Sequence, residues 1–322
     1  MKTKRIQLTI LAVLLGVTGW MVWQRQAILD WTLLYHYTPP TAVTQLAVDD
    51  EMTTKAIHLL YVNHPVISAG KPFTSHCPPG SEKTVVLGCY VGNDRGIYLY
   101  QISDIRLNGV EQVTAAHEML HAAYRRLSSS NRAKLDAMLQ DYYDHGLTDS
   151  RIKDTIDAYR KSEPHDVVNE MHSIFGTEVA NLPGPLEVYY KQYFTDRAKV
   201  VAYTAAYQGE FTSRQTQVTQ YDTQLKSLEQ QIKANETQLE IDKKSLATQN
   251  QQLDSERSSG QIAAYNSGVQ SYNRAVDSYN RLLIDTKNLI NQYNTIVEQR
   301  NNIALEERQL AQELSASSLP KN

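Results

Sequence analysis

Hydrophobic residues follow three different patterns along the 322-residue chain. Residues 6–24 form a run without a charged side chain, and residues 57–199 alternate short apolar runs with turn residues and amphipathic stripes. Residues 200–318 repeat an apolar residue every seven positions. These patterns are typical of a membrane span, of a mixed domain of strands and helices, and of a coiled coil.

The uncharged run predicts an N-terminal transmembrane helix. Nineteen residues at about 1.5 Å each give roughly 28 Å of helix, enough to cross a bilayer. The basic residues within 1–5 are expected to keep that end in the cytoplasm. Trp20 and Trp23 would lie at the membrane–water interface on the opposite side. A cleaved signal peptide is the alternative, but no small-x-small cleavage site follows the run. We expect an anchor over 1–25, a stalk over 26–56 and the remainder outside the cytoplasm.

The heptad repeat predicts a long helical hairpin over residues 200–318, with a disordered tail at 319–322. Arg257-Ser258-Ser259-Gly260 separates two segments of about 50 residues, each roughly 75 Å long as a helix. Polar Asn235, Asp242 and Gln249 face the seam, which weakens it but fixes its register. The hairpin could be a rigid spacer, hold an oligomer or bind a partner. The repeat consists of Phe211, Val218, Leu225, Ile232, Leu239, Leu246 and Leu253, then Ile262, Val269, Val276, Leu283, Ile290 and Val297.

Between these parts, residues 57–199 predict an α+β domain with a small sheet packed against helices. Ile57–Val62 and Ile97–Ile102 have the composition of strands, and the turn at 92–96 joins the second to an earlier run. An exposed strand beside an active site can bind an extended peptide by main-chain pairing. Ile97, Tyr98, Leu99 and Tyr100 are our candidate for such an edge strand, with an ordinary interior strand as the alternative.

The strongest chemical signal is His117-Glu118-Met119-Leu120-His121. On a helix, two histidines four residues apart lie on one face, so that both imidazoles can bind one zinc ion. The glutamate between them can take a proton from the attacking water as a general base. The surrounding apolar residues share the histidine face, which predicts that the face looks into the domain: Val110, Val113, Leu120 and Tyr124.

Cysteine usage and charge narrow the interpretation further. Cys77 and Cys89 are twelve residues apart and flanked by Pro78-Pro79-Gly80 and Gly88, which indicates a loop that returns on itself. A disulfide is therefore predicted between them in an oxidising compartment. The net charge of −3 and the pI near 6.3 argue against a nucleic-acid partner.

A catalytic zinc ion usually has three protein ligands, and the third must come from a later part of this chain. Glu163, Glu170, Glu178 and Glu187 are all available on predicted helices. On a continuous helix, Glu178 lies near the middle of the apolar face, whereas Glu170 lies at its edge.

A family resemblance bears on this choice. Asn169-Glu170-Met171-His172-Ser173, followed directly by Ile174-Phe175-Gly176-Thr177, resembles the second metal-binding block of gluzincin-type zinc metallopeptidases, the class that contains thermolysin. The resemblance implies Glu170 as the third ligand, and Glu178 remains the alternative. His172 and Tyr190 are further candidates, as donors to the oxyanion.

Together these features predict a membrane-anchored, extracytoplasmic zinc peptidase with a zincin-like α+β domain. Its Zn²⁺ would be held by His117, His121 and Glu170, and its substrate would be a peptide or protein, with cell-wall peptide as an alternative. The alternative is a coiled-coil scaffold or adhesion protein whose zinc site is structural or degenerate. A structural site would be closed by a fourth protein ligand.

Overall fold

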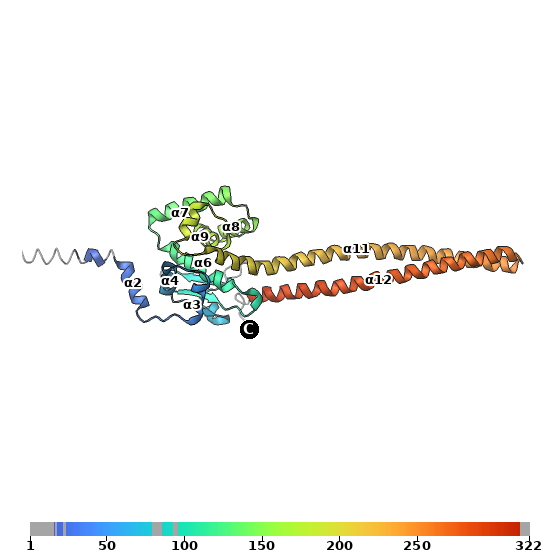
Figure 1. Ribbon diagram of the computed structural model, residues 1–322, viewed down its shortest axis with the longest axis horizontal. Helices are drawn as coiled ribbons and strands as arrows, with labels where there is room; N and C mark the ends of the chain where they lie inside the picture. The colour runs from blue at the N-terminus through green and yellow to red at the C-terminus, as the bar shows by residue number, and fades with distance from the viewer. Residues whose placement is uncertain (1–15, 17, 22–23, 79–85, 93–95, 316–322) are drawn as a thin grey trace, which may run out of the picture. The chain divides into compact units, whose positions relative to one another are not determined.

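The computed structural model describes residues 16, 18–21, 24–78, 86–92 and 96–315. The chain divides into two compact units, one of Met1–Glu210 with Leu310–Asn322 and one of Phe211–Gln309. Figure 1 labels the principal helices, and the elements follow one another in this order: α2 (Arg25–Leu34), α3 (Thr41–Asp49), α4 (Thr54–Val62), β1 (Val66–Ser68), α5 (Gly70–Thr74), β2 (Gly88–Val91), β3 (Gly96–Tyr100), a 3-10 turn (Ile105–Leu107), α6 (Val110–Arg125), α7 (Ser129–Asp141), a π turn (Tyr142–Gly146), α8 (Ser150–Ser162), α9 (Val167–Glu178), α10 (Gly184–Tyr190), α11 (Arg197–Ser258) and α12 (Ile262–Ser315).

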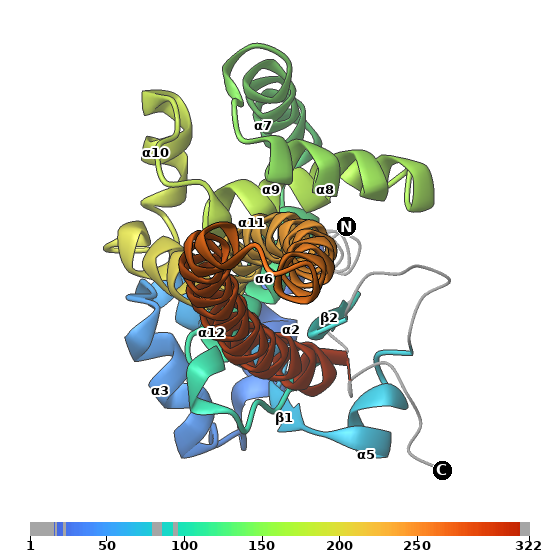
Figure 2. The same cartoon turned by 90° about the vertical axis from the view of Figure 1, so that its right-hand side faces the viewer.

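Helix α6 forms the centre of the first unit. It begins after Gly109, whose φ of +102° is readily available only to glycine, and it packs against α9 on one side and the sheet on another. Figure 2 shows α7 to α10 gathered on one side of α6 and β1, β2 and α5 on the opposite side. Most α6 side chains are consequently buried, and Ala115, Ala116, Met119 and Leu120 are completely so.

The sheet has three strands in the order β1-β3-β2. β3 pairs with β1 in parallel and with β2 in antiparallel orientation, so Ile97–Tyr100 lies in the interior of the sheet. The prediction of an edge strand at Ile97, Tyr98, Leu99 and Tyr100 is therefore wrong. Its second neighbour, β1, has only three residues, which is too short to give a recognisable alternation in the sequence.

Two further segments differ from the sequence-based expectation. Ile57–Val62 belongs to helix α4, which begins where the Thr53 hydroxyl accepts a hydrogen bond from the Ala56 N–H. A short apolar run does not distinguish a strand from a buried helix. The predicted stalk contributes α3, whose Val43 and Leu46 lie in the main core. The predicted α+β domain is thus corrected to a predominantly helical one with a single small sheet.

Among the described residues, no helix is both long and apolar enough to cross a membrane. The predicted transmembrane anchor, and the single-pass membrane location that rested on it, are therefore not supported. Positions 6–15, 17 and 22–23 of the predicted span lie outside the described residues. Helix α2, which follows them, has a buried Asp30 whose carboxylate accepts hydrogen bonds from Arg126 at 2.8 and 2.9 Å. This polar contact attaches α2 to the first unit.

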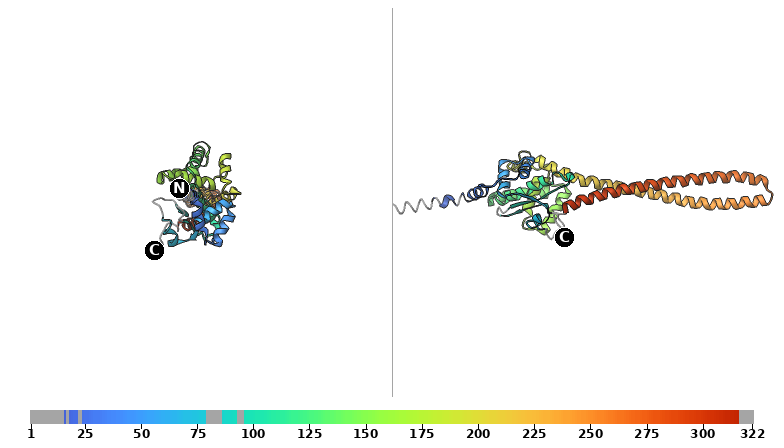
Figure 3. Two further views of the ribbon diagram at one scale, coloured as in Figure 1. Left: turned by 90° about the vertical axis from the view of Figure 1, so that its left-hand side faces the viewer. Right: turned by 90° about the horizontal axis from the view of Figure 1, so that it is seen from below.

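The second unit consists of two antiparallel helices, the remaining parts of α11 and α12, as Figure 3 shows. Its buried and half-buried positions on α11 follow the predicted seven-residue spacing, with Leu228 and Leu253 the most enclosed. Arg300 donates to Asp222 across the pair at 2.8 Å, and Gly260 makes the turn with a φ of +76°. The structure is compatible with the predicted hairpin, although the compact unit spans 211–309 rather than 200–318.

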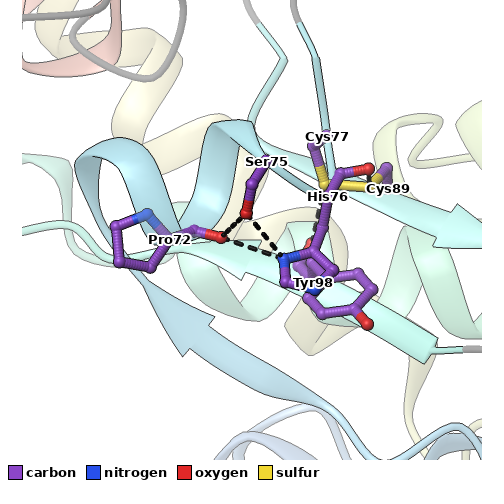
Figure 4. The surroundings of a disulfide bond; sticks show 6 residues. All are labelled: Pro72, Ser75, His76, Cys77, Cys89 and Tyr98. Carbon is purple, nitrogen blue, oxygen red and sulfur yellow. Dashed lines mark hydrogen bonds between the residues drawn. A yellow bond between two sulfur atoms is a disulfide. The ribbon is translucent and has the colours of Figure 1, made fainter.

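A disulfide joins Cys77 to Cys89, with 5.7 Å between their Cα atoms, in agreement with the predicted pairing. Figure 4 shows the bond between the turn that follows α5 and the start of β2, with the His76 ring stacked on Tyr98 at a centroid distance of 4.0 Å. The bond therefore ties β2, an edge strand of the sheet, to the segment that follows α5.

Candidate active site

The structure brings His117, His121 and Glu170 together. The two imidazoles lie on one face of α6 with ring centroids 4.7 Å apart, as the four-residue spacing predicts. Glu170, in the first turn of α9, turns one carboxylate oxygen to each histidine. The distances are 3.6 Å from His117 Nε2 to Glu170 Oε2 and 3.4 Å from His121 Nε2 to Glu170 Oε1.

Close packing of α9 on α6 puts Glu170 within reach of the histidines. A side chain at Gly176 would collide with Leu120 of α6 and lie 2.8 Å from a ring carbon of Tyr190. Only glycine therefore permits this approach of the two helices. Met171, Ile174 and Phe175 fill the rest of the interface and are almost completely buried.

Ser173, one turn further along α9, orients the second histidine. Its hydroxyl lies 3.2 Å from His121 Nδ1, and both side chains are buried. An Nδ1–H that donates to this hydroxyl leaves the lone pair of Nε2 directed at Glu170, which is the tautomer that a metal ligand needs. Thr177 in turn donates its hydroxyl proton to the Ser173 carbonyl at 2.8 Å.

These three side chains fit a zinc ion. Ligand atoms about 2.0–2.1 Å from a tetrahedral zinc are separated from one another by about 3.4 Å. The two histidine–carboxylate distances lie close to that value, and one ligand atom from each residue falls within 4.8 Å of the others. Two imidazoles and one carboxylate are also a donor set that zinc uses in catalytic sites.

Glu118 lies beside this group and is only 6% exposed. Burial raises the pKa of its carboxyl to about 7, and the Glu170 carboxylate contributes in the same direction. His121 and a backbone hydrogen bond from Tyr90 act in the opposite direction. A carboxyl with this pKa can both accept and release a proton near neutral pH.

Strand β2 holds Glu118 from the other side. A Cβ atom at Gly88 would lie 2.5 Å from the Thr114 methyl carbon and 3.0 Å from both Cγ and Oε1 of Glu118. The absence of a side chain at this position therefore allows β2 to lie directly against α6 at the level of Glu118.

This contact predicts the effect of Gly88→Ala. The added methyl group must displace Thr114 or Glu118, and overpacking of this kind costs about 1–3 kcal/mol of folding stability. Gly92→Ala is the matched control, because a Cβ at Gly92 meets nothing within 4 Å. Denaturant unfolding of the two variants checks the prediction, and equal stability would show that β2 does not press against α6.

A cleft of about 710 Å³ opens onto the group. Its walls come from β2 with the residues around it, from α6, and from α8 and α9 with the segment between them. His117, Glu118, His121 and Glu170 all line it, so that a ligand in the cleft would reach each of them.

Other predicted residues have different roles. Glu178, the alternative third ligand, also lines the cleft, but its carboxylate accepts a hydrogen bond from Arg151 at 2.7 Å and does not join the histidines. His172 and Tyr190, the predicted oxyanion donors, are completely buried and do not line the cleft. Tyr190 donates its hydroxyl proton to the His172 carbonyl at 2.6 Å. The prediction for these two is wrong, because both face the core behind α9.

Sequence reasoning missed Tyr159 of α8, which lines the cleft. Burial raises the pKa of its hydroxyl above the ordinary value, and the carboxylates of Glu170 and Glu118 add to the effect. The hydroxyl therefore stays protonated and can donate a hydrogen bond. Ile152 and Ile156, seven and three residues earlier, are completely buried. This helical spacing indicates the inward face and could have identified Tyr159.

Comparisons of the chain with protein-family models, curated proteins and solved structures found no match.

Proposed function

We propose that the protein is a zinc-dependent peptidase in which His117, His121 and Glu170 hold the ion and Glu118 is the general base. One observation carries the proposal. Two imidazole nitrogens and the oxygens of one carboxylate have the spacing of tetrahedral zinc ligands, beside the buried carboxyl of Glu118. The resemblance of residues 169–177 to the second metal-binding block of gluzincin-type peptidases supports the same assignment.

The chemistry follows from the position of each group. When bound, zinc would polarise the scissile carbonyl and lower the pKa of water. Glu118, which lines the same cleft, would accept the proton of the attacking water and pass it to the leaving amine nitrogen. Tyr159, whose hydroxyl stays protonated, would donate to the developing oxyanion.

Strand β2 supports an extended peptide as the substrate. Among the described strands, β2 pairs only with β3 and lines the cleft with its whole length, Gly88–Val91. Apart from the Tyr90 N–H, which donates to Glu118, its other edge would form main-chain hydrogen bonds with a peptide and place a peptide bond near Glu118. The substrate-binding role expected for Ile97–Tyr100 is thus transferred to β2.

The number of ligands favours a catalytic over a structural role for the ion. In the described part of the chain, no fourth histidine, cysteine or acidic residue joins His117, His121 and Glu170. Structural zinc sites are closed by four protein ligands, whereas catalytic sites keep one position open. This difference supports a peptidase rather than a scaffold with a structural ion.

Hydrolysis of a peptide library tests the proposal. The purified full chain is expected to cleave a subset of the peptides. Cleavage should stop after treatment with a chelator and return when one equivalent of zinc is added back, because the ion activates the attacking water. Mass spectrometry of the products gives the scissile bonds. A zinc-loaded protein that cleaves no peptide would contradict the peptidase assignment.

A further inference from the structure

The disulfide between Cys77 and Cys89 lies in the wall of the cleft. Both cysteines line the cleft, as do Gly88 and Tyr90 on either side of Cys89. Figure 4 shows the bond joining the turn after α5 to β2, the strand that lies against Glu118. The bond is therefore part of the candidate active site and can affect the groups around it.

The two neighbours of Cys89 make the contacts between β2 and Glu118. On one side, a Cβ atom at Gly88 would lie 3.0 Å from Glu118 Oε1. On the other side, the backbone N–H of Tyr90 donates a hydrogen bond to the Glu118 carboxylate. A displacement of Cys89 would consequently move both groups that lie against the proposed general base.

Strand β2 has few other contacts that fix its position. It has four residues, all half-buried, and among the described strands it pairs only with β3. Short strands at the edge of a sheet are typical of the segments that open locally at a low free energy. The other end of the disulfide is well anchored, since Cys77 is 2% exposed and packs with Phe73 and Tyr100 in a small core. The bond thus attaches a short edge strand to a buried anchor.

A reductant can reach the disulfide from the cleft. Cys89 is half-buried and Cys77 is buried, so Cys89 Sγ is the sulfur open to attack. One thiolate of a dithiol would attack Cys89 Sγ, form a mixed disulfide and release Cys77 as a thiolate, which then takes up a proton. The second thiolate of the dithiol would displace Cys89 in the same way. The protein gains two thiols, and the dithiol is oxidised to its own disulfide.

We propose that the Cys77–Cys89 bond is a redox switch of the peptidase: the oxidised bond keeps β2 against Glu118, and reduction by a dithiol releases β2 and lowers kcat. This inference rests on the proposed peptidase function and concerns the regulation of the same site. The two cysteines act through β2 and are positioning residues. The proposed zinc ligands lie on α6 and α9, which contain no cysteine, so the ion is expected to stay bound after reduction.

The test compares peptide hydrolysis by the zinc-loaded full chain before and after reduction with a dithiol. We expect kcat to fall about 10–100-fold, since misplacing a catalytic group by roughly 1 Å can cost about 10²-fold, and to return when the bond is formed again. Alkylation and mass spectrometry count the free thiols, and zinc analysis of the same samples checks that the ion stays bound.

The matched control is the double variant Cys77→Ser/Cys89→Ser, which cannot form the bond. Its kcat should equal that of the reduced wild-type protein and should not respond to the dithiol. A dithiol can itself bind zinc, and this variant reports any loss of activity that comes from removal of the ion by the reductant.

Hydrogen exchange distinguishes a switch from a bond that only stabilises the fold. Exchange of the β2 amides, including the Tyr90 N–H that donates to Glu118, should accelerate about tenfold or more on reduction. The amides of α9 around Ile174 and Phe175, in the main core, should not change. This measurement needs neither a substrate nor the double variant, so it still applies if that variant does not fold.

The possible results separate this inference from the peptidase proposal. A fully reduced protein that cleaves peptides as fast as the oxidised one would overturn the switch and leave the peptidase proposal standing. Equal acceleration of exchange in β2 and α9 would also overturn it, as would a double variant whose kcat the dithiol lowers by the same factor. An oxidised, zinc-loaded protein that cleaves no peptide would contradict the peptidase proposal itself, and hydrogen exchange would still decide whether the bond fixes β2.

Discussion

Replacing Glu118 by glutamine is expected to lower the kcat for peptide hydrolysis by about 10²–10⁴-fold while zinc stays bound. Glutamine has the size of glutamate and can keep the hydrogen bond with the Tyr90 backbone, but it cannot accept a proton from water. It also removes a carboxyl that is difficult to ionise in its buried position. We therefore expect the variant to fold at least as well as the wild-type protein.

The measurement combines steady-state kinetics with zinc analysis of the same samples. Glu236→Gln makes the same chemical change at an exposed position of α11 and should keep full activity. Full activity in Glu118→Gln would remove Glu118 from the mechanism. Loss of both zinc and activity would instead assign Glu118 a role in holding the ion.

The sequence predicts the core of the candidate site because its information is local. His117, Glu118 and His121 lie within five residues of one helix, and helical geometry alone puts both imidazoles on one face. The inward direction of that face follows from its apolar neighbours, which the structure buries. The hairpin could be anticipated for the same reason, since a seven-residue repeat reports on one helix at a time.

The remainder of the site depends on contacts between distant segments. Glu170 and Glu178 occupy the same helix, and the local pattern leaves both open, with Glu178 the more central on the apolar face. The structure places Glu170 beside the two histidines because α9 packs closely on α6 at Gly176, where the glycine lets the two helices approach. The edge strand was misassigned because β1, which covers β3, has only three residues. His172 was misassigned because a helix face buried against α6 and α10 resembles one that lines a cleft.

The segment before α4 belongs to the first unit through both apolar and polar contacts. Residues 26–56 resembled a stalk, yet α3 places Val43, Leu46 and Ala47 in the core. Asp30 fixes α2 through its pair with Arg126, an interaction between residues 96 positions apart in sequence. The hydrophobic pattern reveals neither kind of contact. It does not indicate which distant residue a polar side chain pairs with, or which surface an apolar side chain covers.

Replacing His121 by alanine is expected to abolish high-affinity zinc binding, with a loss of affinity greater than the roughly 10–100-fold that follows removal of an outer hydrogen-bond partner of a metal ligand. His121 supplies one of the three proposed ligands, and its Nε2 lies 3.4 Å from Glu170 Oε1. Without the imidazole, the ion would retain only two protein ligands. Hydrolysis should fall with it, because the activation of water depends on the ion.

His145→Ala is the matched control for this variant. The His145 side chain is 77% exposed and pairs only with the neighbouring Asp141 among the residues that the structure describes. Its removal should leave both zinc affinity and hydrolysis unchanged. Thermal unfolding of the metal-free proteins separates loss of the ligand from loss of the fold.

A zinc titration of the wild-type protein, His121→Ala and His145→Ala tests the assignment of His117, His121 and Glu170 most directly. We predict one tightly bound zinc ion per chain in the wild type and in His145→Ala, and none at the same concentrations in His121→Ala. A wild-type protein that binds no zinc, or a His121→Ala variant that binds it as tightly as the wild type, would contradict the account.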